Sequence, residues 1–123
     1  MMSEEIERFL DFLREAEQQL HMAEQTEADA GAATQDLLHR LELGDVSEED
    51  AVRLAWALRD ARRERREAKD LREQAEPIAA WMENNRPVIK ALERLLGEVR
   101  RLERRSQDRI YTPKTGILEE VLS

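Results

Sequence analysis

The feature that most constrains this fold is a series of small and apolar residues, spaced three and four positions apart, in the first third of the chain. They occupy the a and d positions of unbroken heptads at Ile6, Phe9, Leu13, Ala16, Leu20, Ala23, Ala30, Leu37 and Leu41. This pattern predicts one long helix over about residues 3–43, roughly 60 Å in length, that packs against other helices. Glu27 and Thr34 interrupt the series beside an alanine-rich stretch, residues 28–33, whose small side chains would let another helix approach closely.

Turn and capping signals separate this helix from a second one. Gly44 suits the position after a helix end, and Ser47 with Asp50 resembles a capping arrangement at the start of the next helix. We expect that second helix over about residues 48–83, antiparallel to the first because the connection is short. Pro77 lacks a backbone donor and clashes with the preceding turn, so a kink or break is expected near residue 77. The apolar stripe of this helix comprises Leu54, Leu58, Ala61, Ala68, Leu71, Ala75, Ile78 and Met82, with Arg65 filling a gap.

The rest of the chain predicts a third helix and a tail. The run Asn84-Asn85-Arg86 is a stop signal, and Pro87 fits the first turn of a helix over about residues 87–107. The apolar residues of that helix alternate at spacings of four and three: Val88, Leu92, Leu95, Val99 and Leu102. Turn and extended signals follow, and the last apolar residues could form one or two amphipathic turns. The tail, residues 108–123, is expected to dock on its own helices or on a neighbouring chain.

Composition agrees with one all-α domain. Ala, Glu, Lys, Leu and Arg supply 71 of the 123 residues, which is typical of long helices and coiled coils. We therefore expect a long antiparallel helical hairpin, a coiled-coil-like bundle with a third helix and a short C-terminal docking tail. The first helix needs more apolar partner surface than the other two supply, which predicts a homo-oligomer.

Charge and missing residue types narrow the function. Residues 1–50 hold 15 acids and 3 bases, and residues 51–123 hold 13 acids and 17 bases, so the net charge of −8 conceals a polarised chain. That net charge disfavours binding to long duplex nucleic acid. Early acids and the lack of a long apolar run argue against a leader or a membrane partner, so we expect a cytoplasmic protein. The absence of cysteine excludes disulfides and thiolate chemistry.

The first candidate binding residues form a basic stripe on one face of the second helix. We define this stripe as Arg59, Arg62, Arg65, Arg66 and Lys69. Interleaved acids could pair with the basic residues of this region, for example as Arg63–Glu67, Arg66–Asp70 and Lys69–Glu73. The stripe would then be a self-paired, solvated surface. Alternatively, several copies of it converge in an oligomer and bind phosphates, which arginine contacts through two hydrogen bonds.

A second candidate group lies in the tail, at Arg109, Tyr111 and Lys114. An aromatic ring between two cations could stack on a base and hold its phosphate. The alternative is that Tyr111 packs against the helices with its hydroxyl exposed.

Two further arrangements carry weaker signals for metal chemistry. One is a shared helix face that presents Asp36, His39 and Glu42, which a solvated polar surface explains equally well. The other is Glu24-x-x-Glu27 followed by Glu42-x-x-Asp45, which resembles the paired acidic helices that hold magnesium in all-α nucleotide pyrophosphohydrolases. The second of these pairs straddles the expected helix end. No catalytic signature is present, so neither an enzyme nor a cofactor is predicted.

Three stretches stand out beyond these patterns: LLHRLEL at 37–43, RRERREAKD at 62–70 and RIYTPK at 109–114. Together they resemble a group of small helical accessory proteins of bacteriophages and prophages of Gram-positive bacteria. The resemblance covers residues 37–114, and because the group typically starts near the LLH segment, it implies that the helix before this segment is an addition in this chain. It implies a viral protein of a class rich in inhibitors of host defence, some of which are oligomers that sequester cyclic nucleotide signals.

These observations favour a non-enzymatic accessory binding protein in the cytoplasm of a bacterium or of a phage-infected cell. More specifically, we hypothesise that the protein counteracts host defence by sequestering a nucleotide-like anionic signal in an oligomer. The basic stripe and the tail group would bind that ligand. The alternative is a protein–protein interaction module that inhibits a host protein, and a less favoured one is a magnesium-dependent nucleotide pyrophosphohydrolase.

Overall fold

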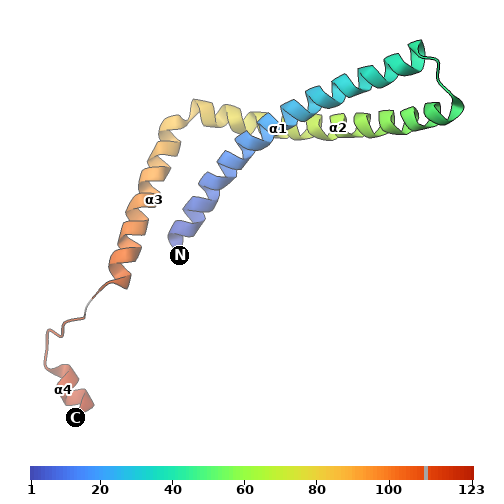
Figure 1. Ribbon diagram of the computed structural model, residues 1–123. Coiled ribbons are helices and arrows are strands. Elements are labelled where there is room, and N and C mark those ends of the chain that lie inside the picture. The colour runs from blue at the N-terminus through green and yellow to red at the C-terminus, as the bar shows by residue number, and fades with distance from the viewer. Residues whose placement is uncertain (110) are drawn as a thin grey trace.

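The computed structural model describes residues 1–109 and 111–123 and contains helices joined by short segments (Figure 1). The helices are α1 (Met2–Leu43), α2 (Glu48–Asn84), α3 (Arg86–Gln107) and α4 (Ile117–Leu122). The expected all-α architecture, with two long antiparallel helices and a third, is confirmed. None of the described helices is long and apolar enough to cross a membrane.

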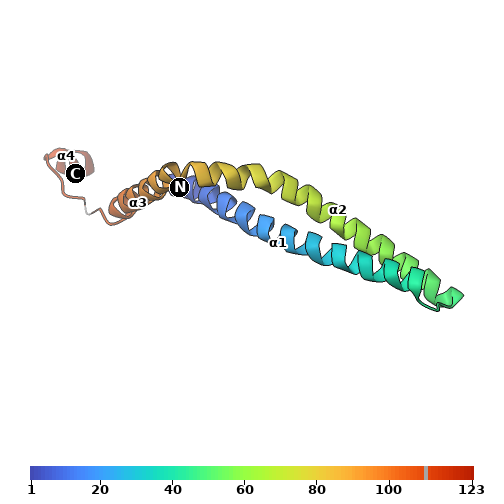
Figure 2. The ribbon, with the colours of Figure 1, turned by 90° about the horizontal axis from the view of Figure 1, so that it is seen from above.

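Helices α2 and α3 pack one after the other along α1. Side-chain pairs join Ser3 to Glu103 and Arg14 to Glu93 on α3, and Glu27 to Arg72 on α2. Residue numbers rise along α1 as they fall along its partners, so α2 and α3 both run antiparallel to α1. Figures 1 and 2 show the result, a long molecule in which α3 lies beside the N-terminal part of α1 and α2 beside the rest.

The break between α2 and α3 falls at Asn85. Helix α2 continues through Pro77 and ends at Asn84, so the prediction of a break near residue 77 is wrong, whereas a kink there stays a prediction. The missing donor of Pro77 costs the helix one hydrogen bond, which packing against α1 on both sides of the proline outweighs. Asn85 has non-helical φ and ψ angles of −129° and 30°, and its side-chain amide donates to the carbonyl of Trp81 at 2.8 Å. Pro87 lies in the first turn of α3, as the sequence predicts.

Local contacts define the turn between α1 and α2. The hydroxyl of Ser47 accepts a hydrogen bond from the amide of Asp50 at 3.2 Å, which confirms the predicted cap. Gly44 is extended, with φ −92°, and its amide donates to the carbonyl of Arg40 at 3.0 Å. A Cβ atom on residue 44 would lie 2.6 Å from that carbonyl oxygen. Glycine is therefore required here by close approach of the backbone and not by a left-handed conformation.

The core between α1 and α2 is narrow and built largely from alanine. We call its central part the alanine seam: Ala23, Ala30, Ala68 and Ala75, each no more than 6% exposed. The pair of Glu27 with Arg72 sets a register in which Ala30 lies level with Ala68, and Ala23 with Ala75. Because these side chains are small, the two helices can approach closely. The alanine-rich stretch was expected to let another helix approach closely, and that helix is α2 of the same chain.

The buried rows differ from the expected ones near the N-terminus and on α3. Leu10 is 2% exposed, whereas its neighbour Phe9 is 44% exposed, and on α3 the buried residue is Leu96. The first turns of α1 face α3 and its later turns face α2, so the row that begins with Phe9 is buried or half-buried only from Ala16 onward. The other heptad row, from Ile6 through Leu13 to Leu41, is buried or half-buried throughout. An ideal helix also drifts by about 20° per heptad. The expected core residues that remain exposed are Phe9, Leu71, Val88, Leu95 and Leu102.

The tail extends beyond the end of α3 (Figure 1). Helix α4 forms in it, as one short amphipathic segment, and residues 111–123 are exposed. Within the described residues, α4 contacts none of the other helices. Residues 111–123 of the tail therefore do not dock on the helices of their own chain, and docking on a neighbouring chain stays a prediction.

Candidate anion-binding site

The basic stripe lies at the middle of α2, on one side of the helix. Arg62, Arg65, Arg66 and Lys69 surround a depression of about 600 Å³ that is open to solvent, with Asp70 at its edge. Arg59 shares a neighbouring hollow with Arg62, Arg63 and Arg66. Spacings of three and four residues place these side chains next to one another on a helix. The structure therefore brings all five predicted members of the stripe together.

Most arginines of this region have no acidic partner. Of the three pairs named in the sequence analysis, Lys69–Glu73 forms, at 4.0 Å, whereas Arg63–Glu67 and Arg66–Asp70 do not form among the described residues. In the part of the chain that the structure describes, no carboxylate lies within 4.0 Å of Arg59, Arg62, Arg63, Arg65 or Arg66. These side chains are exposed. In the described residues Lys69 is therefore the self-paired member of the stripe, whereas its four guanidinium groups have no acidic partner and can meet an external anion.

Helix α1 leaves room beside the stripe. Arg65 also lines a second depression, whose α1 side is formed by Glu24, Glu27, Ala28, Gly31, Ala32, Thr34 and Gln35. Most of these residues are small, and nothing lies within 4 Å of where a Cβ on Gly31 would be. The two glutamates make the α1 edge negative, so a bound anion would be held from the α2 side.

Arg72 differs from the stripe residues because its side chain is fully engaged. Its guanidinium donates to Glu27 through Nε and Nη2 and to Glu76 through Nη1. The hydrogen bond from Arg72 holds the pKa of Glu27 below its usual value, and the nearby positive charges of Arg65 and Lys69 act in the same direction. Arg72 and Glu27 thus form a polar layer between the two helices and are not available to a ligand.

Sequence reasoning missed this polar layer. Glu27 was predicted as an interruption of the α1 heptads and as one of four candidate magnesium ligands, and it was not paired with a residue on α2. A signal was present, since Leu58, Arg65 and Arg72 follow one another at intervals of seven. That interval turns Arg72 towards α1, where a half-buried cation is stabilised by an acid opposite it.

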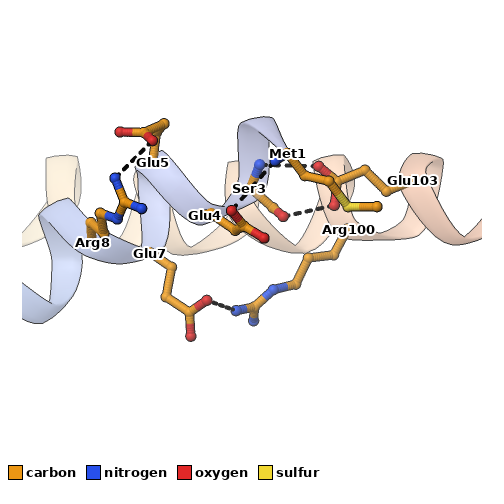
Figure 3. A network of polar contacts seen from close by, with 8 residues as sticks. All are labelled: Met1, Ser3, Glu4, Glu5, Glu7, Arg8, Arg100 and Glu103. Carbon is orange, nitrogen blue, oxygen red and sulfur yellow. Dashed lines mark hydrogen bonds and ion pairs between the residues drawn. The ribbon is translucent and has the colours of Figure 1, made fainter.

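A second network, also unforeseen, ties the start of α1 to α3 (Figure 3). The amide and the hydroxyl of Ser3 donate to the Glu103 carboxylate at 3.0 and 2.7 Å. These bonds lower the pKa of Glu103. Arg100 forms an ion pair with Glu7 at 2.7 Å beside it. The two partners of the central contact are 100 residues apart in sequence, so no local pattern could have indicated it.

The tail group is separate from the basic stripe. Arg109, Tyr111 and Lys114 lie beyond the end of α3, and none of them lines a depression with the stripe residues (Figure 1). Tyr111 is 73% exposed, so it does not pack against the helices. The eight predicted binding residues therefore form two groups on different parts of the chain.

The acidic arrangements do not converge. Among the residues that the structure describes, no three His, Asp or Glu side chains come together in a way that could hold a metal ion. Glu27 accepts hydrogen bonds from Arg72. The potential ligands Asp36, His39 and Glu42 are exposed on α1.

Comparison of the chain with protein-family models, with curated proteins and with solved structures finds no match. The function is therefore argued from the residues and their geometry.

Proposed function

We propose that this chain is a non-enzymatic binding protein that takes up a nucleotide-like anion on the basic stripe of α2. The observation that carries the proposal is the set of neighbouring arginines without acidic partners around an open depression. Guanidinium groups bind phosphates through two parallel hydrogen bonds, and these charge-assisted bonds are stronger than neutral ones. A ligand with several phosphate groups would gain most from such a surface.

The dimensions of the stripe suit a small ligand with more than one phosphate. Arg59 and Lys69 are ten residues apart, which corresponds to about 15 Å along a helix. The depression of about 600 Å³ is within the range of small-molecule sites. No aromatic side chain lines it, so phosphate contacts would dominate the affinity, and binding would weaken as salt increases. A cyclic or linear oligonucleotide fits this description better than a single phosphate.

The resemblance to small helical phage proteins supports a biological role for such binding. A protein of this class that sequesters a nucleotide signal would lower its free concentration in the infected cell and so counteract host defence. Sequestration requires affinity and no chemical step. The role thus fits a chain in which the basic side chains, and no catalytic grouping, are the prominent feature.

Calorimetry with a panel of cyclic oligonucleotides, linear dinucleotides and ADP-ribose tests the proposal. The test variant is Arg62→Ala/Arg66→Ala, and the matched control is Arg104→Ala/Arg105→Ala, which removes the same charge from exposed positions on α3. We expect at least one ligand to bind the wild type, the test variant to lose at least tenfold in affinity and the control to change little. Absence of heat for every ligand, or equal losses in the two variants, would contradict the proposal.

A different surface favours the alternative, a protein–protein interaction module that inhibits a host protein. Val52 and Trp56 lie four residues apart on α2 near its connection to α1, and they are 56% and 58% exposed. The guanidinium of Arg59 lies 5.1 Å from the Trp56 ring centroid. Tryptophan and arginine are enriched among the residues that dominate protein–protein binding energy. This end of the hairpin could therefore anchor a partner protein.

The two functions are separated by the same variants. A host protein that binds the immobilised chain, is lost with Trp56→Ala and is retained with Arg62→Ala/Arg66→Ala would support the interaction module. The opposite pattern assigns binding to the basic stripe.

A further inference from the structure

Helix α3 carries two apolar rows. The first packs towards α1 and consists of Ile89, Leu92, Leu96 and Val99, all buried or half-buried. The second consists of Val88, Leu95 and Leu102, which recur every seven residues and are 47%, 43% and 57% exposed. Apolar residues repeated at this interval on an exposed face are the pattern of a coiled-coil seam. Within the described residues, the second row is therefore a seam without a partner.

Helices α1 and α2 expose large apolar residues in the same way. Phe12 and Leu71, 50% and 38% exposed, line one groove between the two helices together with Ile78, so both helices present apolar side chains to one side. Trp81 lies on the same face of α2 as Ile78, three residues away, and is 41% exposed.

The second row of α3 lies on this same side of the molecule. Glu7 and Arg100 form an ion pair on one side of the α1–α3 contact. Phe9 is about 200° around α1 from Glu7, and Leu95 is about 140° around α3 from Arg100. Both therefore point to the side opposite the ion pair. We call this surface the apolar side: Phe9, Phe12, Leu71, Trp81, Val88, Leu95 and Leu102.

We infer that a second copy of this chain covers the apolar side, with α1 of each copy over α3 of the other in a two-fold symmetric four-helix bundle. Charge favours this pairing of helices. Apart from Glu7 and Arg100, which pair with each other on the opposite side, residues 2–20 of α1 hold five acids and two bases, whereas α3 holds six bases and three acids. Placing α1 over α3 of the partner brings opposite charges together, and placing α1 over α1 would bring acids together.

The apolar area agrees with a stable dimer. A fully covered aromatic side chain buries roughly 200 Å² and a large aliphatic one roughly 100 Å². The seven residues of the apolar side are between 38% and 57% exposed. Together they offer roughly 500 Å² of apolar surface per copy, and a standard interface buries about 800 Å² per partner, of which somewhat more than half is apolar.

The dimer leaves the basic stripe accessible. Leu71 and Arg62 are nine residues apart, which places them on opposite sides of α2, about 180° apart. The two stripes would therefore face away from the interface, and each anion site would be formed by one chain. The inference is independent of the proposed function for this reason.

Native mass spectrometry and light scattering test the interface. We expect the wild type to have about twice the mass of the 14.4 kDa chain. Leu95→Lys and Phe12→Lys should give monomers with an unchanged helical circular dichroism spectrum. The matched control is Val52→Lys, a substitution at an equally exposed apolar residue outside the apolar side, and it should remain dimeric. A monomeric wild type, or equal loss of dimer in Val52→Lys, would overturn the inference.

Disulfide trapping reports on the arrangement without a charged substitution. The chain has no cysteine, so single cysteines can be placed freely. When Phe9→Cys and Leu95→Cys proteins are mixed and oxidised, we expect the disulfide to form mainly between unlike chains. A product made mainly of two Phe9→Cys chains would show α1 over α1 and refute the proposed arrangement.

Discussion

Replacing Ala30 by leucine tests whether close packing of small residues holds α1 and α2 together. Ala30 is 4% exposed and lies level with Ala68, which is 6% exposed. Leucine adds three carbon atoms at a position where the facing helix leaves no space for them. Overpacking of this kind costs about 1–3 kcal/mol, because side chains leave their preferred rotamers or the backbone shifts. We therefore expect Ala30→Leu to lower the free energy of unfolding by that amount.

Ala28→Leu is the matched control for this substitution. Ala28 lies on the same helix two residues earlier and is exposed. Ala28→Leu makes the same chemical change and the same change in helix propensity as Ala30→Leu, but the added atoms do not displace a facing helix. Its effect should stay within about 0.5 kcal/mol, the range of ordinary surface substitutions.

A compensating substitution sharpens the test. Ala68→Gly removes the methyl group opposite Ala30 and by itself costs about 1 kcal/mol of helix stability. In the Ala30→Leu background the same change also makes room for the larger side chain. We therefore expect the double variant to be more stable than the sum of the single effects predicts, by at least about 0.5 kcal/mol.

Urea unfolding followed by circular dichroism at one protein concentration measures these quantities. The slope of the free energy against urea should be the same for all variants, so that the midpoints report stability. The packing argument fails if Ala30→Leu is as stable as Ala28→Leu, or if the two substitutions in the seam act additively.

Three further outcomes are expected. Gly44→Ala should lower the melting temperature, because the added Cβ atom would lie 2.6 Å from a backbone oxygen. Gly97 lies inside α3, and an added Cβ atom there meets nothing within 4 Å, so Gly97→Ala should stabilise the chain by about 0.5–1 kcal/mol. Thermal melts that rank the two variants in the reverse order would contradict this geometry. In the folded chain the pKa of Glu27 lies below its usual value of 4.5. The charged carboxylate therefore stabilises the fold fully at a pH above 4.5, and this stabilisation is lost as the pH falls through the lower pKa of the folded state. The difference in melting temperature between wild type and Glu27→Gln should therefore shrink in acid, and a constant difference from neutral to acidic pH would refute this. Ser3→Ala removes a 2.7 Å hydrogen bond and should raise the pKa of Glu103 in a carboxyl NMR titration, where an unchanged value would count against the bond.

The helices and their ends could be predicted because the interactions that set them are local. The hydroxyl of Ser47 reaches an amide three residues on, and the side chain of Asn85 reaches a carbonyl four residues back. Membership of the basic stripe follows in the same way from helical spacing. Pro77 is a local signal that allowed a helix end which does not form, because packing along α1 keeps the helix continuous through it.

The state of the candidate site could not be predicted from spacing. The sequence allowed Arg63–Glu67 and Arg66–Asp70 pairs, and neither forms in the described part of the chain. Whether a surface arginine meets an acid depends on the rotamers of both side chains and on what lies beside them. Spacing within one helix specifies only which side chains can reach one another.

The sequence by itself determined an all-α chain, the bounds of its helices and an antiparallel hairpin, because capping, turns and apolar periodicity act over a few residues. Only the tertiary structure decided which residues are buried in the first turns of α1 and which apolar row of α3 packs inward. Leu10 is inside and Phe9 outside because the first turns of α1 face α3 and its later turns face α2. Which side of α1 a partner helix covers depends on contacts such as that of Ser3 with Glu103, two residues that lie 100 positions apart. The local sequence pattern carries no information about such contacts.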